Sequence, residues 1–192
     1  MRLSNIRQMI GTGGFILVAI LTLTLFSSAQ SYAEQKTLII YFSQTGNTKA
    51  VCEALQKDLG ADIIEVKNAS QDKPKKGELP AIAPKSIDLT KYSSIILGSP
   101  IWAAQIAPVI KAVLKNNDFK GKKVVLFTTT NVAIPEEFRG KSKALVQESG
   151  GTVVGYYEVI VADTVEKKAV PRKKEQIVAD ALKLVPELQK GL

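Results

Sequence analysis

Apolar and polar residues along this chain fall into five short apolar runs separated by longer mixed stretches. The apolar runs are largely continuous, which is typical of strands buried on both faces of a parallel sheet. They cover residues 37–42, 62–66, 93–98, 122–128 and 152–161. The stretches that follow them predict helices over residues 47–59, 106–115, 136–148 and 173–190. Strands that alternate with helices predict an α/β fold, a doubly wound five-stranded parallel sheet.

Glycine and proline mark where these elements end. Gly60 follows the first predicted helix and is a natural C-cap. Pro108 is compatible only with the first turn of its helix, and Pro186 is expected to end or kink the last helix. Residues 67–91 are polar and contain three prolines, so we expect a long connection with at most a short helix.

The first 33 residues differ in composition from the rest of the chain. Two arginines are followed by an apolar stretch, densest over residues 15–26, and then by small and polar residues. This order is typical of a signal peptide, with Ser31 and Ala33 as the small residues of a cleavage site after Ala33. The alternative is an uncleaved membrane anchor. The sequence therefore predicts a leader over residues 1–33, a domain over residues 34–192, and an exported protein, periplasmic or extracellular, that stays membrane-anchored if the leader is not cleaved.

The chain is basic, with 26 lysine and arginine residues against 18 acidic residues and a net charge of +8. Without the predicted leader, 24 basic residues remain and the net charge is +6. The basic residues are spread out, no aromatic residues are interleaved with them, and no nucleic-acid motif is present, so nucleic-acid binding is not expected. The charge would suit an acidic partner protein or peripheral association with an anionic membrane surface.

Histidine is absent and cysteine occurs once, at Cys52. Without histidine, Ser-His-Asp catalysis and histidine-containing zinc sites are excluded, so we predict neither catalytic side chains nor a metal site. A single cysteine forms no internal disulfide. Its place on the first predicted helix indicates a buried, inert thiol.

The junction between the first predicted strand and its helix concentrates small polar residues. Ser43, Thr45 and Thr48 offer hydroxyl groups, Asn47 can cap the helix, and Gly46 allows the backbone to turn tightly. Backbone N–H groups then converge where the positive end of the helix dipole points, which suits a phosphate monoester. The same cluster is also typical of a simple turn followed by a helix N-cap.

The chain's single tryptophan, Trp102, lies in the loop that follows the third predicted strand, residues 99–104. A core side chain would not normally project at that point. An indole beside a phosphate site suits a planar heteroaromatic ligand, because stacking adds about 1 kcal/mol beyond the burial of area. Packing of Trp102 against its own domain is the alternative interpretation.

Three segments of the chain resemble the flavodoxin family. They are Tyr-Phe-Ser-Gln-Thr-Gly-Asn-Thr at 41–48, Gly-Ser-Pro-Ile-Trp at 98–102, and Phe-Lys-Gly-Lys-Lys-Val-Val-Leu-Phe at 119–127. The resemblance extends over essentially all of residues 36–190. It implies the flavodoxin-like strand order 2-1-3-4-5 and an FMN cofactor at the switch point between the first and third strands.

The resemblance also assigns site residues, which fall into three groups. The FMN phosphate would be bound by Ser43, Gln44, Thr45, Gly46, Asn47 and Thr48, the isoalloxazine would be lined by Ser99, Pro100, Ile101, Trp102 and Ala103, and a third wall would consist of Thr129, Thr130 and Asn131. The third loop, residues 129–135, lacks the glycine-rich turn of relatives that share the Pro-Ile-Trp loop. The family's electron carriers are usually acidic, whereas this chain is basic.

Three functions follow as hypotheses. The first is an FMN-binding electron-transfer flavoprotein acting outside the cytoplasm, with a redox partner protein or a small-molecule electron acceptor. The alternative is an FMN-dependent NAD(P)H or quinone-type reductase, for which the connection over residues 67–91 would form a second pocket. The third is a flavodoxin-like binding protein without flavin, which the unusual third loop would favour.

Overall fold

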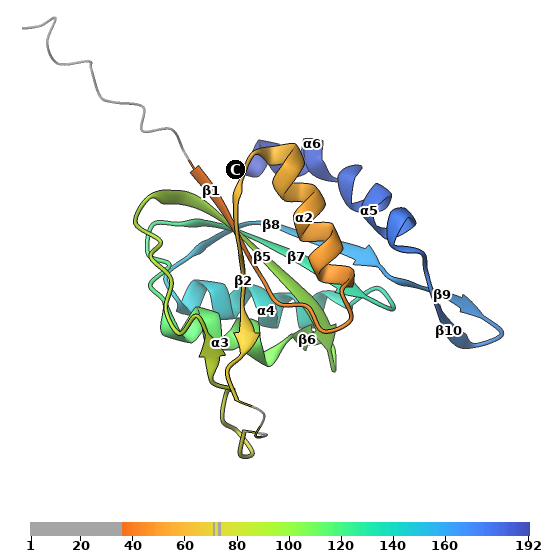
Figure 1. The fold of residues 1–192 in the computed structure, drawn as a ribbon, viewed down its shortest axis with the longest axis horizontal. Helices are drawn as coiled ribbons and strands as arrows, with labels where there is room; N and C mark the ends of the chain where they lie inside the picture. Colours follow the sequence, from red (N-terminus) through yellow and green to blue (C-terminus); the bar gives the residue numbers. More distant parts are fainter. Residues whose placement is uncertain (1–35, 71, 73) are drawn as a thin grey trace, which may run out of the picture. The chain divides into compact units, whose positions relative to one another are not determined.

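The computed structural model describes residues 36–192 except residues 71 and 73. The predicted leader therefore lies outside the described residues. The described domain is built around one sheet whose five parallel strands follow the order β2-β1-β5-β7-β8 (Figure 1). These strands are β1 (Lys36–Tyr41), β2 (Asp62–Glu65), β5 (Tyr92–Trp102), β7 (Lys123–Thr130) and β8 (Thr152–Ile160). The order reproduces the predicted 2-1-3-4-5 arrangement, so the predicted fold class is confirmed.

Helices cover both faces of the sheet (Figure 1). One face is covered by α3 (Pro108–Asn116) and α4 (Glu136–Glu148), and the other by α2 (Asn47–Leu59), α5 (Lys174–Leu182) and α6 (Val185–Gly191). Helices α2 and α4 have the predicted bounds, and Pro108 opens α3 at a position where its missing N–H costs no hydrogen bond. The predicted last helix is broken before Pro186, which lies in the first turn of α6.

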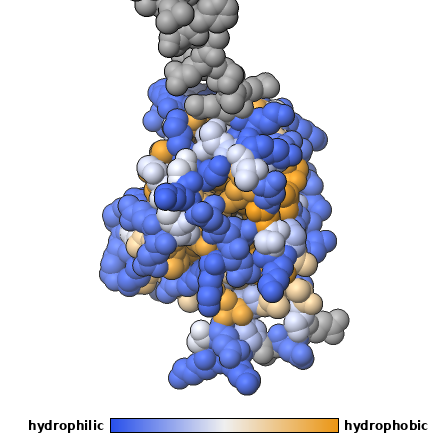
Figure 2. All heavy atoms as spheres, turned by 90° about the vertical axis from the view of Figure 1, so that its left-hand side faces the viewer, coloured by the Kyte–Doolittle hydropathy of each residue, from blue (hydrophilic) through white to orange (hydrophobic). Residues whose placement is uncertain are grey.

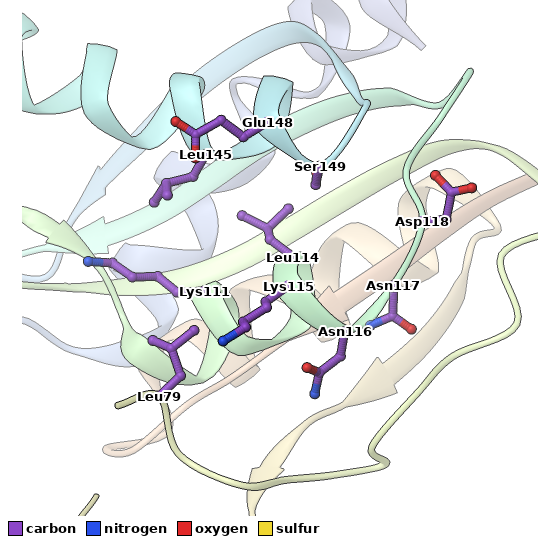
Figure 3. A pocket seen from close by; sticks show the side chains of 10 residues that line it. All are labelled: Leu79, Lys111, Leu114, Lys115, Asn116, Asn117, Asp118, Leu145, Glu148 and Ser149. Atoms are coloured by element: carbon purple, nitrogen blue, oxygen red, sulfur yellow. The ribbon is translucent and has the colours of Figure 1, made fainter. Parts of the chain in front are cut away.

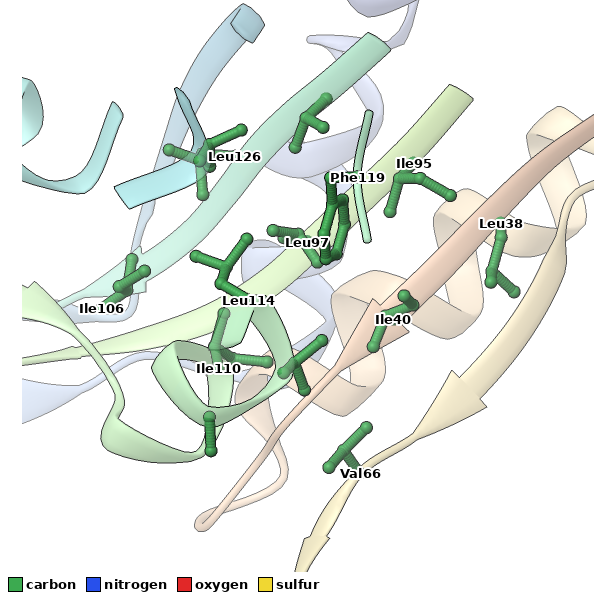
Figure 4. Packing of buried hydrophobic residues seen from close by; sticks show 14 of the residues in the cluster. Leu38, Ile40, Val66, Ile95, Leu97, Ile106, Ile110, Leu114, Phe119 and Leu126 are labelled. Atoms are coloured by element: carbon green, nitrogen blue, oxygen red, sulfur yellow. The ribbon is translucent and has the colours of Figure 1, made fainter. Parts of the chain in front are cut away.

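Alternation along the strands sends side chains into two separate cores. On β1, Leu38 and Ile40 join the cluster beneath α3 and α4, whereas Ile39 and Tyr41 join the cluster beneath α2 and α5. Figure 4 shows the first cluster, where Leu38, Ile40 and residues of β5 and β7 face α3. Because both faces of each central strand are buried, the strands need the continuous apolar runs seen in the sequence.

Strand β5 continues four residues beyond the predicted strand end, so the expected loop over residues 99–104 is largely extended. Ile101 and Trp102 pair with β6 (Gln105–Ile106) in an antiparallel hairpin. The turn is made by Ala103 and Ala104, whose φ angles are 46° and 58°. Non-glycine residues rarely adopt this left-handed conformation, so nothing in the local sequence pointed to a two-residue turn.

Two further hairpins were not predicted. The connection over residues 67–91 contains a short pair, β3 (Lys67–Asn68) with β4 (Ile82–Ala83), and its described residues contain no helix. The second hairpin, β9 (Ala162–Val165) with β10 (Lys168–Pro171), follows β8 and projects from the domain (Figure 1). Its strands are mostly exposed and therefore lack the apolar runs from which strands were predicted.

The surface of the domain is mainly hydrophilic on the face in Figure 2, with smaller hydrophobic areas between the hydrophilic residues. In the described part of the chain, no helix combines the length and the apolar character needed to cross a membrane.

Candidate functional site

The carboxyl ends of β1, β5 and β7 lie side by side, so the three loops singled out in the sequence meet at one edge of the sheet. A cavity of about 540 Å³ opens there, a volume typical of small-molecule sites. Its predicted lining residues are Thr45, Asn47, Pro100, Ile101, Trp102, Thr129, Thr130 and Asn131. The structure therefore brings residues from all three predicted groups to one cavity.

The first loop ends at the N-terminus of α2. Gly46 is the N-cap, with φ 87°, and its N–H donates to Ser43 Oγ at 3.1 Å. The prediction that Asn47 caps the helix is wrong, because Asn47 is the first helical residue and no side chain caps this end. The first turn of α2 also contains no acidic residue. An uncapped helix N-terminus carries partial positive charge and N–H donors, so this loop fits a phosphate group.

Thr48 and Ser99 support the loops from behind rather than lining the cavity. The buried hydroxyl of Thr48 lies 2.8 Å from the hydroxyl of Thr129, which ties the first loop to the end of β7. Ser99 is fully buried, accepts a hydrogen bond from Ala107 N–H and donates to the Pro100 carbonyl. Ser43, Gln44, Gly46 and Ala103 also lie outside the cavity lining.

Trp102 lies at the mouth of the cavity with 38% of its surface exposed. Its ring meets Phe42 edge to face, with centroids 5.6 Å apart and planes at 86°. This contact holds the indole in place while leaving apolar ring surface accessible, as a stacking position for a planar ligand requires.

An ion pair between Arg139 and Glu158 supports the third loop. Glu158 on β8, about one tenth exposed, accepts a hydrogen bond from the Arg139 guanidinium at 2.8 Å and another from the Ile134 N–H at 3.4 Å. Thr130 donates from its hydroxyl to the Val132 carbonyl at 2.8 Å. These contacts hold residues 131–135 although the loop lacks the glycine-rich turn of the relatives that share the Pro-Ile-Trp loop.

Six residues that line the cavity were missed by the sequence analysis. They lie after β8 and are Val161, Ala162, Ala169, Pro171, Arg172 and Lys174. Arg172 and Lys174 were counted in the sequence analysis only among the basic residues that are spread along the chain, without a role at the site. Only the β9–β10 hairpin and the start of α5 bring them to this edge of the sheet.

Cys52 lies beneath the site and is fully buried, as predicted. Burial raises the pKa of its thiol far above the usual range, which removes the reactive thiolate. Burial, with a contribution from Glu65, also raises the pKa of Tyr41 to about 12. Both groups therefore stay protonated and uncharged at neutral pH.

Another cavity, of about 720 Å³, lies elsewhere, between α3, α4 and the connection after β3 (Figure 3). Lysine, asparagine and acidic side chains line it together with Leu79, Leu114 and Leu145, and no predicted site residue reaches it. The described residues contain no cluster of acidic or cysteine side chains that could hold a metal ion.

These features together define a flavodoxin-like α/β protein. They are the strand order, the helices on both faces of the sheet, and a loop suited to phosphate beside an aromatic residue. A family model described as "Flavodoxin domain" matches residues 38–168. The chain therefore belongs to the flavodoxin family, as the resemblance predicted.

Individual relatives agree with this assignment. A flavodoxin of Synechocystis sp. is 28% identical over 145 residues, covering 71% of this chain and 78% of the relative. A flavodoxin of Nostoc sp. is 26% identical over 150 residues, covering 73% of this chain and 80% of the relative. Among solved structures, a flavoprotein from Lactobacillus acidophilus in complex with FMN is 25% identical, with a TM-score of 0.55, covering 65% of this chain and 93% of that chain.

Proposed function

We propose that this protein is an FMN-binding electron-transfer flavoprotein that acts outside the cytoplasm. The observation that carries the cofactor assignment is the convergence of an uncapped helix N-terminus, Trp102 and the Thr129–Asn131 segment on one cavity. The relative from Lactobacillus acidophilus, whose structure was solved with FMN, supports the same cofactor. When bound, FMN supplies one- and two-electron redox chemistry.

The protein's own residues bind and orient the cofactor. Backbone N–H groups after Gly46 and the hydroxyl of Thr45 would hold the phosphate, and Trp102 would cover one face of the ring system. The hydroxyl groups of Thr129 and Thr130 lie at the third wall, but both are mostly buried and bonded within the protein. The cavity lining contains no carboxylate, thiol, phenol or imidazole side chain, which suits electron transfer to a redox partner protein.

Replacing Trp102 by alanine is expected to weaken FMN binding about tenfold, because stacking of a planar ring on an aromatic side chain contributes about 1–3 kcal/mol. Titration of FMN fluorescence against the purified variant measures this. Trp102→Phe is the matched control and is expected to retain most of the affinity. Equal dissociation constants for the wild type and Trp102→Ala would show that the indole does not contact the flavin.

Steady-state oxidation of NAD(P)H distinguishes an electron carrier from an NAD(P)H-dependent reductase. With FMN bound, we expect NAD(P)H oxidation in the presence of a quinone to proceed no faster than with the same amount of unbound FMN. The flavin should nevertheless be reduced by a chemical donor and reoxidised by an acceptor protein. Rapid, saturable NAD(P)H oxidation would identify a reductase instead.

The location outside the cytoplasm is supported by the sequence of residues 1–33 alone. Fractionation of the native cells is expected to find the protein in the periplasm or the medium, and N-terminal sequencing is expected to start at Glu34. Protein confined to the cytoplasm with Met1 retained would contradict the proposed location and leave the cofactor assignment untouched.

A further inference from the structure

We propose that Lys174 is a phosphate-binding residue and makes this site prefer the phosphorylated flavin over riboflavin. This inference rests on the proposed FMN site. It adds a charged ligand from the start of α5 to a loop that contains none of its own.

The side chain of Lys174 extends to the loop at the N-terminus of α2. A Cβ atom built on Gly46 would lie 3.2 Å from Lys174 Nζ and 3.7 Å from Lys174 Cε. The ammonium group therefore lies directly against the loop that forms the N-terminus of α2, and Lys174 also lines the cavity. Lys174 is the first residue of α5, and Ile177 and Ala181 of this helix pack in the same core cluster as Val51 and Leu55 of α2. Packing between the two helices thus fixes where the lysine stem begins.

Charge at this point is unbalanced in the described structure. Three sources of positive potential meet: the N-terminus of α2, the N-terminus of α5 and the ammonium of Lys174. The first turn of α2 contributes no carboxylate, and Glu175 is the acidic residue in the first turn of α5. Among the described residues, no ion pair involves Lys174. A dianionic phosphate bound here would interact favourably with both helix N-termini and with the ammonium group.

Arg172 has a different role although it lines the same cavity. Its guanidinium donates to Asp180 at 2.6 Å and to the Ile160 carbonyl at 2.8 Å, and it lies 3.7 Å from Asp163. These contacts hold the base of the β9–β10 hairpin against α5. Because acidic side chains already pair with Arg172, Lys174 is the cationic lining residue that can bind an incoming anion.

Specificity follows from the chemistry of the two flavins. FMN and riboflavin share the ring system, and only FMN carries the phosphate that an ammonium group attracts. A charged hydrogen bond of this kind, partly screened because Lys174 is exposed, corresponds to about a tenfold change in affinity.

The test compares dissociation constants for FMN and riboflavin in the full-length wild type, Lys174→Gln and Lys57→Gln. Lys57 is the matched control because it lies in the last turn of α2, at the opposite end from Gly46. We expect Lys174→Gln to bind FMN about tenfold more weakly at low salt and riboflavin within about twofold of the wild type. High salt should narrow the FMN difference, because it screens the charge. Lys57→Gln should match the wild type, and circular dichroism should show that both variants fold.

Two results would overturn the inference while leaving the FMN site in place. One is FMN binding by Lys174→Gln with the affinity of the wild type. The other is an equal loss for FMN and riboflavin, which would indicate a packing role for the lysine stem. A wild type that binds neither FMN nor inorganic phosphate at this loop would overturn both this inference and the proposed function.

Discussion

Replacing Gly98 by alanine is expected to destabilise the domain by about 2–3 kcal/mol, the upper range for adding a methyl group to a packed core. Gly98 lies on β5, under the site, where a Cβ atom would be 2.4 Å from Cys52 Sγ and 2.8 Å from Tyr41 Cβ. Both neighbours are buried, and the Tyr41 atom is bonded to the backbone, so they cannot simply swing away. For a domain of this size the change corresponds to a fall in the thermal midpoint of about 5–10 °C.

Thermal unfolding followed by circular dichroism measures this effect. Gly140→Ala is the matched control, since nothing lies within 4 Å of a Cβ atom there and alanine favours the helix α4. Cys52→Ala combined with Gly98→Ala should recover part of the loss, because it removes the closer of the two contacts. A thermal midpoint for Gly98→Ala equal to that of the wild type would show that β5 and α2 pack less closely than described.

The combined substitution Thr45→Ala and Asn47→Ala is expected to weaken FMN binding at least about a hundredfold, since each hydrogen bond to a charged group contributes about 1.5–3 kcal/mol. Both side chains line the cavity at the loop that would hold the phosphate. Riboflavin affinity should change little, because riboflavin lacks that group. Fluorescence titration with each flavin gives the two dissociation constants.

Thr152→Ala serves as the control for that experiment, because Thr152 is exposed at the start of β8, at the opposite edge of the sheet. It should bind both flavins like the wild type. If the double variant lost FMN and riboflavin affinity equally, the loop would support the ring system or the fold rather than the phosphate.

Much of the fold was predictable because it depends on local pattern. Strands β1 and β7 are buried on both faces and therefore appear as continuous apolar runs, and α2 ends at Gly60, whose φ of 62° suits glycine. Elements without such a signal were missed. The β9–β10 hairpin is exposed, and the turn at Ala103 and Ala104 uses a backbone conformation that alanine seldom adopts.

The site was predictable where its residues lie next to strand ends, as for Thr45 and Trp102. Which side chains of each loop line the cavity was not predictable. Thr48, for example, directs its hydroxyl to Thr129 instead of toward the cavity. Lys174 comes from the opposite end of the chain, and a run of lysines has the same appearance in sequence whether it faces solvent or a ligand. Its role depends on the packing of α5 against α2, which no local pattern encodes.

The most direct test of the central claim is titration of the purified protein, stripped of any flavin, with FMN while flavin fluorescence and visible absorption are recorded. We predict saturable quenching with one FMN per chain at micromolar concentrations or below, together with a shifted absorption band from stacking on Trp102. An absence of quenching by both FMN and riboflavin would contradict the account and leave a flavodoxin-family domain that does not use flavin.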